Sequence, residues 1–284
     1  MENLAASTFL DEINITNTIS QTLAENLLGR EQLPKILLRY ADLKANFNAV
    51  TFDECTDPTS QEIWKFSSGV TPYCDYDDTS NVPIPITNPL FINVENIVSF
   101  DFPIWFNLNS RHRIMMVTQD PMPRSVEWYG KCRDAICSTT FGIHNATWRK
   151  KGNGGKRMWQ LIQKLIGSEI GIYLTDCKKF YIQDTNGRHV HETEDQLNEY
   201  NLILHEEIKA VRPSIIVAFG NKSKVSLDSL YEAVDIPIVT MPHFSGQAQG
   251  KIREFFNWTA ETPLTVDAQV DLYHSMIIKR LNNG

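Results

Sequence analysis

The chain has 284 residues, of which 42% are hydrophobic, so it can bury a sizeable core. Its net charge of −7 argues mildly against a nucleic-acid partner, and no apolar run approaches the roughly 18 to 20 residues that a membrane span requires. The start of the chain lacks the positive region of a signal peptide, and the five cysteines form no C-x-x-C pair. We therefore expect a globular, cytoplasmic protein with no membrane association, metal or cofactor.

The first 45 residues predict two helices that are separated near Gly29, with Pro34 opening the second. Residues 50–87 are rich in Asp, Ser, Thr and Pro and predict a long irregular connection, either a substrate-shaping lid or a plain surface linker. We assign residues 1–100 to a helical and irregular N-terminal extension that packs on the core.

Strands and helices alternate over the rest of the chain. The predicted strands cover residues 113–118, 170–175, 214–219 and 237–241. The predicted helices cover residues 158–166, 195–211, 226–233, 252–258 and 266–281. This alternation predicts an α/β fold, a three-layer α/β/α sandwich with a short, mostly parallel four-stranded sheet. We assign residues 101–260 to this domain and residues 261–284 to a C-terminal helix packed on the core.

Polar, turn-forming residues follow each predicted strand at once. Asp120 follows the first strand, Asp176 the second, Gly220 the third and His243 the last. Parallel strands end at one edge of a sheet, so Asp120, Asp176 and His243 are expected to converge in one crevice there.

The order and spacing of these segments resemble the uracil-DNA glycosylase superfamily over roughly residues 111–256. The resemblance rests on four short motifs in family order, beginning with Gln119-Asp120-Pro121. It implies a DNA glycosylase of the same fold that needs no cofactor. Some members carry an iron-sulfur cluster on four cysteines, and this sequence shows no such spacing.

Cleavage of a base from deoxyribose develops positive charge on the sugar and negative charge on the base. The resemblance implies that Asp120 stabilises the cation and positions water, while His243 hydrogen-bonds the oxyanion that forms on the base. Phe244 stands where the family commonly has a proline, whereas Ser245 still suits close approach to a phosphate. A plain turn is the alternative role of Asp120 before Pro121.

The target base must leave the duplex and stack on an aromatic side chain. Phe141, in Thr140-Phe141-Gly142, lies at about the family's distance after the first motif and is the candidate; an ordinary core phenylalanine is the alternative. Gln119 of the first motif completes this side of the predicted base pocket.

Two positions depart from family members that act on uracil. Such members read the base with an asparagine where this chain has Asp176, and a carboxylate cannot donate to uracil O4. It can accept from the cytosine amine, and a carboxyl kept protonated by burial could also donate to cytosine N3. Met122 replaces a tyrosine that blocks C5 substituents, and methionine leaves room. We expect a C5-modified cytosine, although Asp176 could instead cap a helix or pair with Lys178 or Lys179.

A stretch from 135 to 168 has no acidic residue, which predicts a face that follows DNA phosphates. A solvated surface is the alternative. The predicted DNA contacts are Arg149, Lys150, Lys151, Lys156, Lys222 and Ser245.

These features together predict a monofunctional DNA glycosylase that flips a base out of DNA, hydrolyses its N-glycosidic bond and leaves an abasic site. No lysine occupies an evident nucleophile position, so strand cleavage is not expected. We expect a monomer whose partner is DNA, with a role in antiviral defence if the base is a phage modification. The alternatives are a conventional uracil-DNA glycosylase, an inactive DNA-binding or inhibitor-binding module of the same fold, and an enzyme acting on free nucleosides.

Overall fold

The computed structural model describes residues 2–48, 84–91, 97–121, 136–143, 149, 153–184, 188–230, 235–245, 248–259 and 263–283. Met122, Lys150 and Lys151 lie outside the described residues, as does most of the predicted connection 50–87. Within these ranges, no helix has the length and apolar character needed to cross a membrane.

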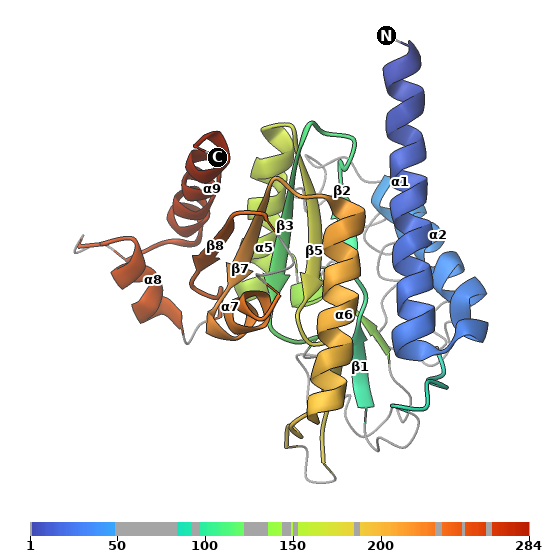
Figure 1. Cartoon of the computed structure of the whole chain (residues 1–284). Helices are drawn as coiled ribbons and strands as arrows, with labels where there is room; N and C mark the ends of the chain where they lie inside the picture. The colour runs from blue at the N-terminus through green and yellow to red at the C-terminus, as the bar shows by residue number, and fades with distance from the viewer. Residues whose placement is uncertain are drawn as a thin grey trace.

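A five-stranded sheet forms the centre of the molecule, in the order β2-β5-β3-β7-β8 (Figure 1). The strands are β2 (Ile104–Phe106), β3 (His112–Thr118), β5 (Ile170–Asp176), β7 (Ile215–Phe219) and β8 (Ile238–Met241). The last four pair in parallel, and β2 runs antiparallel to β5. β5 and β7 are buried throughout, as expected of parallel strands covered on both faces. The predicted α/β fold class is confirmed; β2 was not predicted because three residues are too few to show a pattern.

A second, three-stranded sheet lies beyond one end of the first. It has the order β4-β1-β6, with strands β1 (Ile97–Asp101), β4 (Ile136–Ser138) and β6 (Phe180–Ile182). The Asp101 amide donates to the Lys179 carbonyl at 2.7 Å, so the end of β1 meets the chain where it leaves β5 for β6. This small sheet was also not predicted.

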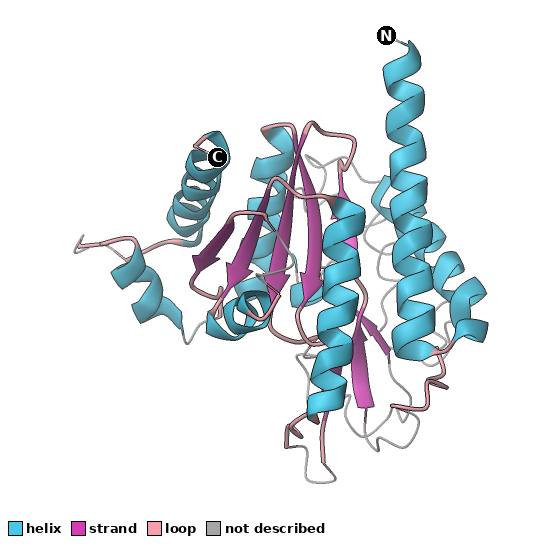
Figure 2. Ribbon diagram, in the orientation of Figure 1, coloured by secondary structure: helices cyan, strands magenta, loops and turns pink. Residues whose placement is uncertain are grey.

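Helices cover both faces of the larger sheet (Figure 2). Behind it in this view, α5 (Asn153–Gly167) packs against the C-terminal helix α9 (Val266–Asn282). In front, α6 (Glu194–Val211) packs against the N-terminal helix α1 (Glu2–Leu23). The predicted break near Gly29 is present: a π-helical turn (Ala24–Leu28) precedes it, and the short 3-10 turn Arg30–Gln32 leads into α2 (Leu33–Asn48). Gly29 has φ 126°, and a Cβ there would lie 1.8 Å from Thr87 Oγ1.

Three helices begin three to five residues earlier than the sequence predicted, and α5 is one of them, because it starts at Asn153 and not at residue 158. α7 (Asn221–Asp228) starts directly after β7, not at residue 226, and α8 (Gln249–Phe255) starts three residues before residue 252. The N-cap of α7 is Gly220, whose φ of 93° suits glycine and turns the chain at once from strand to helix. The polar start of α7 has little apolar periodicity, so its first turn looked like a loop.

Candidate functional site

Strand register places the predicted site residues along one edge of the sheet. Thr118 pairs with Asp176 across β3 and β5, and Phe219 pairs with Met241 across β7 and β8. Asp120 lies two residues beyond the end of β3, and His243 two residues beyond the end of β8. The edge therefore runs from Asp176 through Asp120 and the start of α7 to His243.

A pocket of about 710 Å³ opens at the His243 end of this edge. Four predicted site residues line it: Gln119, Lys222, His243 and Ser245. Asp120, Phe141 and Asp176 do not line this pocket. Asp120 contacts the lining residue Gln119, and Phe141 contacts the lining residue His243. Lys251 of α8, which sequence reasoning did not select, adds a second positive charge to the wall.

The His243 ring has a defined hydrogen-bonding role. The Ser245 amide donates to His243 Nδ1 at 3.1 Å, so Nδ1 is an acceptor and the neutral ring carries its proton on Nε2. Burial lowers the pKa of His243 below its ordinary value, against an opposing effect of the Asp120 charge. At neutral pH the ring is therefore a neutral hydrogen-bond donor through Nε2.

The segment that carries His243 is held by hydrogen bonds from two residues that the sequence did not assign to the site. Arg157 Nη1 donates to the Phe244 carbonyl at 3.1 Å, and the Tyr273 hydroxyl donates to the Pro242 carbonyl at 2.7 Å. Phe244 is buried, with its ring centroid 4.4 Å from that of Tyr273. Phe244, which stands where the family commonly has a proline, is thus part of the hydrophobic core. Tyr273 is buried on α9, and Arg157 is a buried member of the stretch 135–168, for which the sequence predicted a face that follows DNA phosphates.

Phe141 lies directly beside His243. Their ring centroids are 4.9 Å apart, with planes tilted by 31°. Phe141 sits in the short turn Thr140–Gly142 with φ 55°, a left-handed conformation that is uncommon for a bulky residue. Its side chain is half-buried. This strained turn presents the ring next to the pocket instead of sinking it fully into the core.

Asp120 stands between the two ends of the edge. Gln119 Nε2 donates to Asp120 Oδ2, and the Asp120 charge acts on both His243 and Asp176. The Gln119 carbonyl accepts from the Lys178 amide at 3.0 Å and from Cys177 Sγ at 3.2 Å, which ties the loop after β3 to the end of β5.

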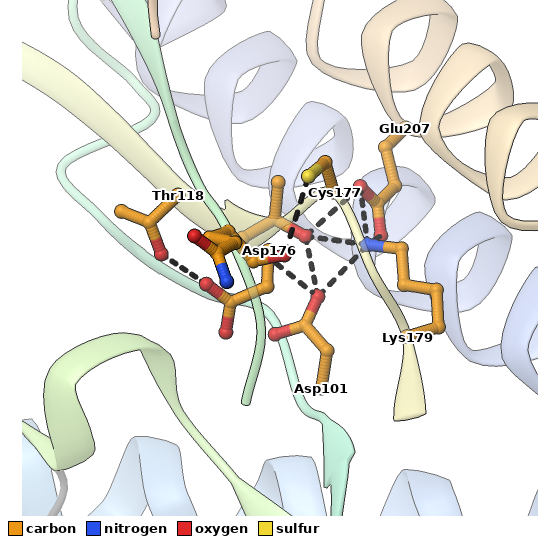
Figure 3. Close-up of polar contacts among 8 residues, drawn as sticks. Asp101, Thr118, Asp176, Cys177, Lys179 and Glu207 are labelled. Carbon is orange, nitrogen blue, oxygen red and sulfur yellow. Dashed lines mark hydrogen bonds and ion pairs between the residues drawn. The ribbon is translucent and has the colours of Figure 1, made fainter. Parts of the chain in front are cut away.

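Asp176 is a fully buried carboxyl (Figure 3). Thr118 Oγ1 donates to its Oδ1, while Oδ2 has no hydrogen-bond partner among the residues that the structure describes. Burial raises the pKa of Asp176 well above its ordinary value, and the nearby Asp101 charge raises it further. Asp176 caps no helix, because β6 follows it, and its carboxyl does not pair with Lys178 or Lys179, which bond to other acids.

Behind Asp176 lies a buried ion cluster that the sequence did not reveal. Lys179 Nζ lies 2.8 Å from both Asp101 Oδ2 and Glu207 Oε1, and all three side chains are inaccessible to solvent. Thr175 Oγ1 lies 2.7 Å from Asp101 Oδ2 and 3.0 Å from Glu207 Oε2. The cluster joins β1, β5 and α6 (Figure 3).

The predicted DNA contacts fall into two groups. Lys156 on α5 and Lys222 on α7 are exposed. Arg149 is a correction: it is only 2% exposed, and its guanidinium lies 4.8 Å from the centroid of the Trp159 ring. A planar, weakly hydrated guanidinium stacks readily on an aromatic face, so Arg149 packs inside the protein and adds no charge to an exposed phosphate-binding face.

No group of three or more His, Cys, Asp or Glu side chains in the described ranges is arranged to hold a metal ion.

Comparison with known proteins gives one positive result. A family model described as "Uracil DNA glycosylase superfamily" matches residues 106–262, which is more than half of the chain and spans the whole edge from Asp120 to His243. No curated protein matches the chain.

Proposed function

Because the chain belongs to the uracil DNA glycosylase superfamily, we propose that it is a monofunctional DNA glycosylase acting on a flipped cytosine-type base with a C5 modification. Membership supports glycosylase activity on DNA in general. The substrate, the flipping of the base and the abasic product are our proposal. If the modified base comes from phage DNA, the enzyme serves antiviral defence, and we propose a cytoplasmic monomer.

Asp120 and His243 would divide the work of breaking the bond. As the bond from C1′ to the base nitrogen breaks, its electrons go to the base, where the His243 Nε2–H can donate to the oxyanion. The Asp120 carboxylate would stabilise the cation at C1′ and orient the water that attacks it. The Gln119 amide holds this carboxylate in place.

The observation that carries the substrate proposal is the buried Asp176 carboxyl. The raised pKa favours the protonated form, and a protonated carboxyl can donate one hydrogen bond and accept another. Thr118 occupies Oδ1 as a donor, which leaves the partnerless Oδ2 as the place for the proton. Donation to N3 and acceptance from N4 match cytosine, whereas uracil presents N3–H and O4. Met122, which lies outside the described residues, would leave room at C5.

The state of Lys179 supports hydrolysis without strand cleavage. Burial alone would lower the pKa of Lys179, but the charges of Asp101 and Glu207 outweigh it and raise that pKa. A lysine held protonated between two acids is not a nucleophile for Schiff-base formation. This supports an abasic site as the product.

The test is an excision assay on DNA that contains uracil, plain cytosine or C5-modified cytosine, with Asp120→Asn as the control variant. We expect released base and alkali-labile sites with modified cytosine, and at least a 100-fold loss with Asp120→Asn. Uracil release alone would retain the enzyme class and overturn the assignment of Asp176. DNA binding that survives Asp120→Asn, with no release by the native protein, would indicate a binding module.

A further inference from the structure

We propose that Asp101 is the positioning residue of this site: it fixes the backbone of Asp176 and, as a buried anion, makes Asp176 the carboxyl that keeps its proton. The inference rests on the proposed function, in which a protonated Asp176 reads the base. It adds a residue from a separate sheet and a physical reason for the base preference.

The geometry places one oxygen of Asp101 at the centre of three donors. Oδ2 accepts from the Asp176 amide at 3.0 Å, from Thr175 Oγ1 at 2.7 Å and from Lys179 Nζ at 2.8 Å. Oδ1 is buried and has no hydrogen-bond partner among the described residues. Three donors on one oxygen is the arrangement of an ionised carboxylate. Figure 3 shows Asp101 next to Asp176, on the opposite side from Thr118.

The charges of the cluster do not balance if every acid ionises. Lys179 brings one positive charge to three buried carboxyls, those of Asp101, Glu207 and Asp176. An uncompensated charge in such a place is costly, so one ammonium favours protons on two of the three acids: Asp176 and, below about pH 7, Glu207. Lys179 contacts Asp101 and Glu207 directly, whereas its nitrogen makes no hydrogen bond to Asp176.

The other groups that face Asp176 act in both directions: the hydrogen bond from Thr118 and the charge of Lys179 lower its pKa, and the charge of Asp120 raises it. Asp120, beyond β3, adds a second negative charge. Thr118 is a neutral donor, and burial raises the pKa of the neighbouring Cys177 thiol to about 11, so that it stays neutral. Asp176, which the ammonium does not contact, thus keeps its proton, and Glu207 keeps a second one below about pH 7.

Base preference then depends on the Asp101 charge. A protonated Asp176 offers the donor and acceptor pair that fits a cytosine-type base; an ionised Asp176 offers acceptors alone and loses the bond to N3. Asp101→Asn removes the charge with little change in shape. The amide oxygen can take the place of Oδ2 and its three donors, and the amide nitrogen the place of the partnerless Oδ1.

The test titrates Asp176 directly, without DNA. The infrared carbonyl band of a protonated carboxyl is measured against pH, and the spectrum of Asp176→Asn is subtracted so that Glu207 does not contribute. We expect the Asp176 band of the native protein to persist to higher pH than that of an ordinary aspartic acid, and its midpoint to fall by about one pH unit or more in Asp101→Asn. Asp228→Asn, which removes a carboxylate from the exposed pair with Lys224, should leave the midpoint unchanged.

Excision kinetics provide the second readout. The value of kcat/KM for modified cytosine should fall on the alkaline side at the midpoint of the infrared titration, and Asp101→Asn should move both together. Absence of the Asp176 band at neutral pH overturns the proposal, even if Asp101→Asn fails to fold, and so does a midpoint that Asp101→Asn leaves in place. A protein that shows the band and its shift but releases no base would refute the glycosylase proposal and retain the role of Asp101.

Discussion

The two ends of the sheet edge are built on different physical principles. At the Asp176 end, the polar groups are buried and held by charge, with Lys179 bonded to acids from β1 and α6. At the His243 end, a pocket is open to solvent, and the segment that carries the histidine is held by packing and by two hydrogen bonds to its backbone, from Arg157 to the Phe244 carbonyl and from the Tyr273 hydroxyl to the Pro242 carbonyl. The charged end can control the protonation of Asp176, whereas the packed end presents His243 as a neutral hydrogen-bond donor at neutral pH.

The largest effect should come from breaking the charged end. Lys179→Met leaves Asp101 and Glu207 buried without their cation, and we expect the free energy of unfolding to fall by about 3 to 5 kcal/mol. Urea unfolding measures this. Lys224→Met, which removes the cation of an exposed pair with Asp228, is the matched control and should cost less than about 1 kcal/mol. Equal losses of unfolding free energy in Lys179→Met and Lys224→Met would show that the buried ion pairs contribute no more to stability than the exposed pair.

His243→Ala tests the packed end. The variant removes the donor to the base oxyanion, and we expect kcat to fall by about 100- to 1,000-fold, because one such donor contributes this much elsewhere. Single-turnover excision measures the loss. Unfolding by urea should change much less than in Lys179→Met, since the His243 ring is only half-buried. A loss confined to KM would contradict the assigned role.

The pH dependence of stability should separate the two ends further. Burial raises the pKa of Glu207 from 4.5 to about 7, so the folded state binds this proton more tightly than the unfolded chain. The resulting stabilisation is fully present below about pH 4.5 and is lost as pH rises through 7, an effect on the order of 1 to 3 kcal/mol. Urea midpoints measured from pH 5 to pH 8 should show this decline, and Glu207→Gln should flatten it. An unchanged slope in the variant would assign the titration elsewhere.

Tyr273→Phe probes the support beneath His243. The variant loses the 2.7 Å bond to the Pro242 carbonyl and retains the ring that packs on Phe244. We expect a stability loss of about 1 kcal/mol and a smaller fall in kcat than in His243→Ala. Thermal unfolding and excision on the same preparation measure both effects, and a fall in kcat as large as that of His243→Ala would make this bond part of the catalytic geometry.

The smallest effect on stability should come from Lys222→Ala at the pocket wall. The side chain is exposed, so stability should change by less than about 0.5 kcal/mol. If it binds a phosphate, DNA affinity should fall for all sequences and the slope of log K against log salt should decrease by about 1. Lys209→Ala, on an exposed face of α6, is the control that should leave the slope unchanged.

The sequence predicted the fold class because buried strands of the larger sheet appear as apolar runs. It also placed Asp120 and His243 at strand ends, and the register brings those ends to one edge. It could not reveal the cluster behind Asp176. Asp101 lies in the small sheet, whose three strands are far apart along the chain and were not predicted. Lys179 follows another lysine, and two adjacent lysines are typical of a solvated turn.

The two arginines illustrate the same limit. Arg149 and Arg157 look like members of one basic stretch, yet one stacks on Trp159 and the other bonds to the Phe244 carbonyl. Both are less than 10% exposed. The composition of a segment gives its charge, but it does not tell whether an arginine side chain points to solvent or into the protein. Burial of an arginine depends on partners that lie elsewhere in the chain.

The ion cluster also bears on the lifetime of the folded molecule. Lys179 bonds to residues 78 and 28 positions away along the chain. The charged groups of the cluster are therefore buried only after β1, β5 and α6 have come together. Contacts completed after the folding transition state slow unfolding and leave the folding rate almost unchanged. We therefore expect this buried cluster to prolong the time that each molecule stays folded, without making the chain fold faster.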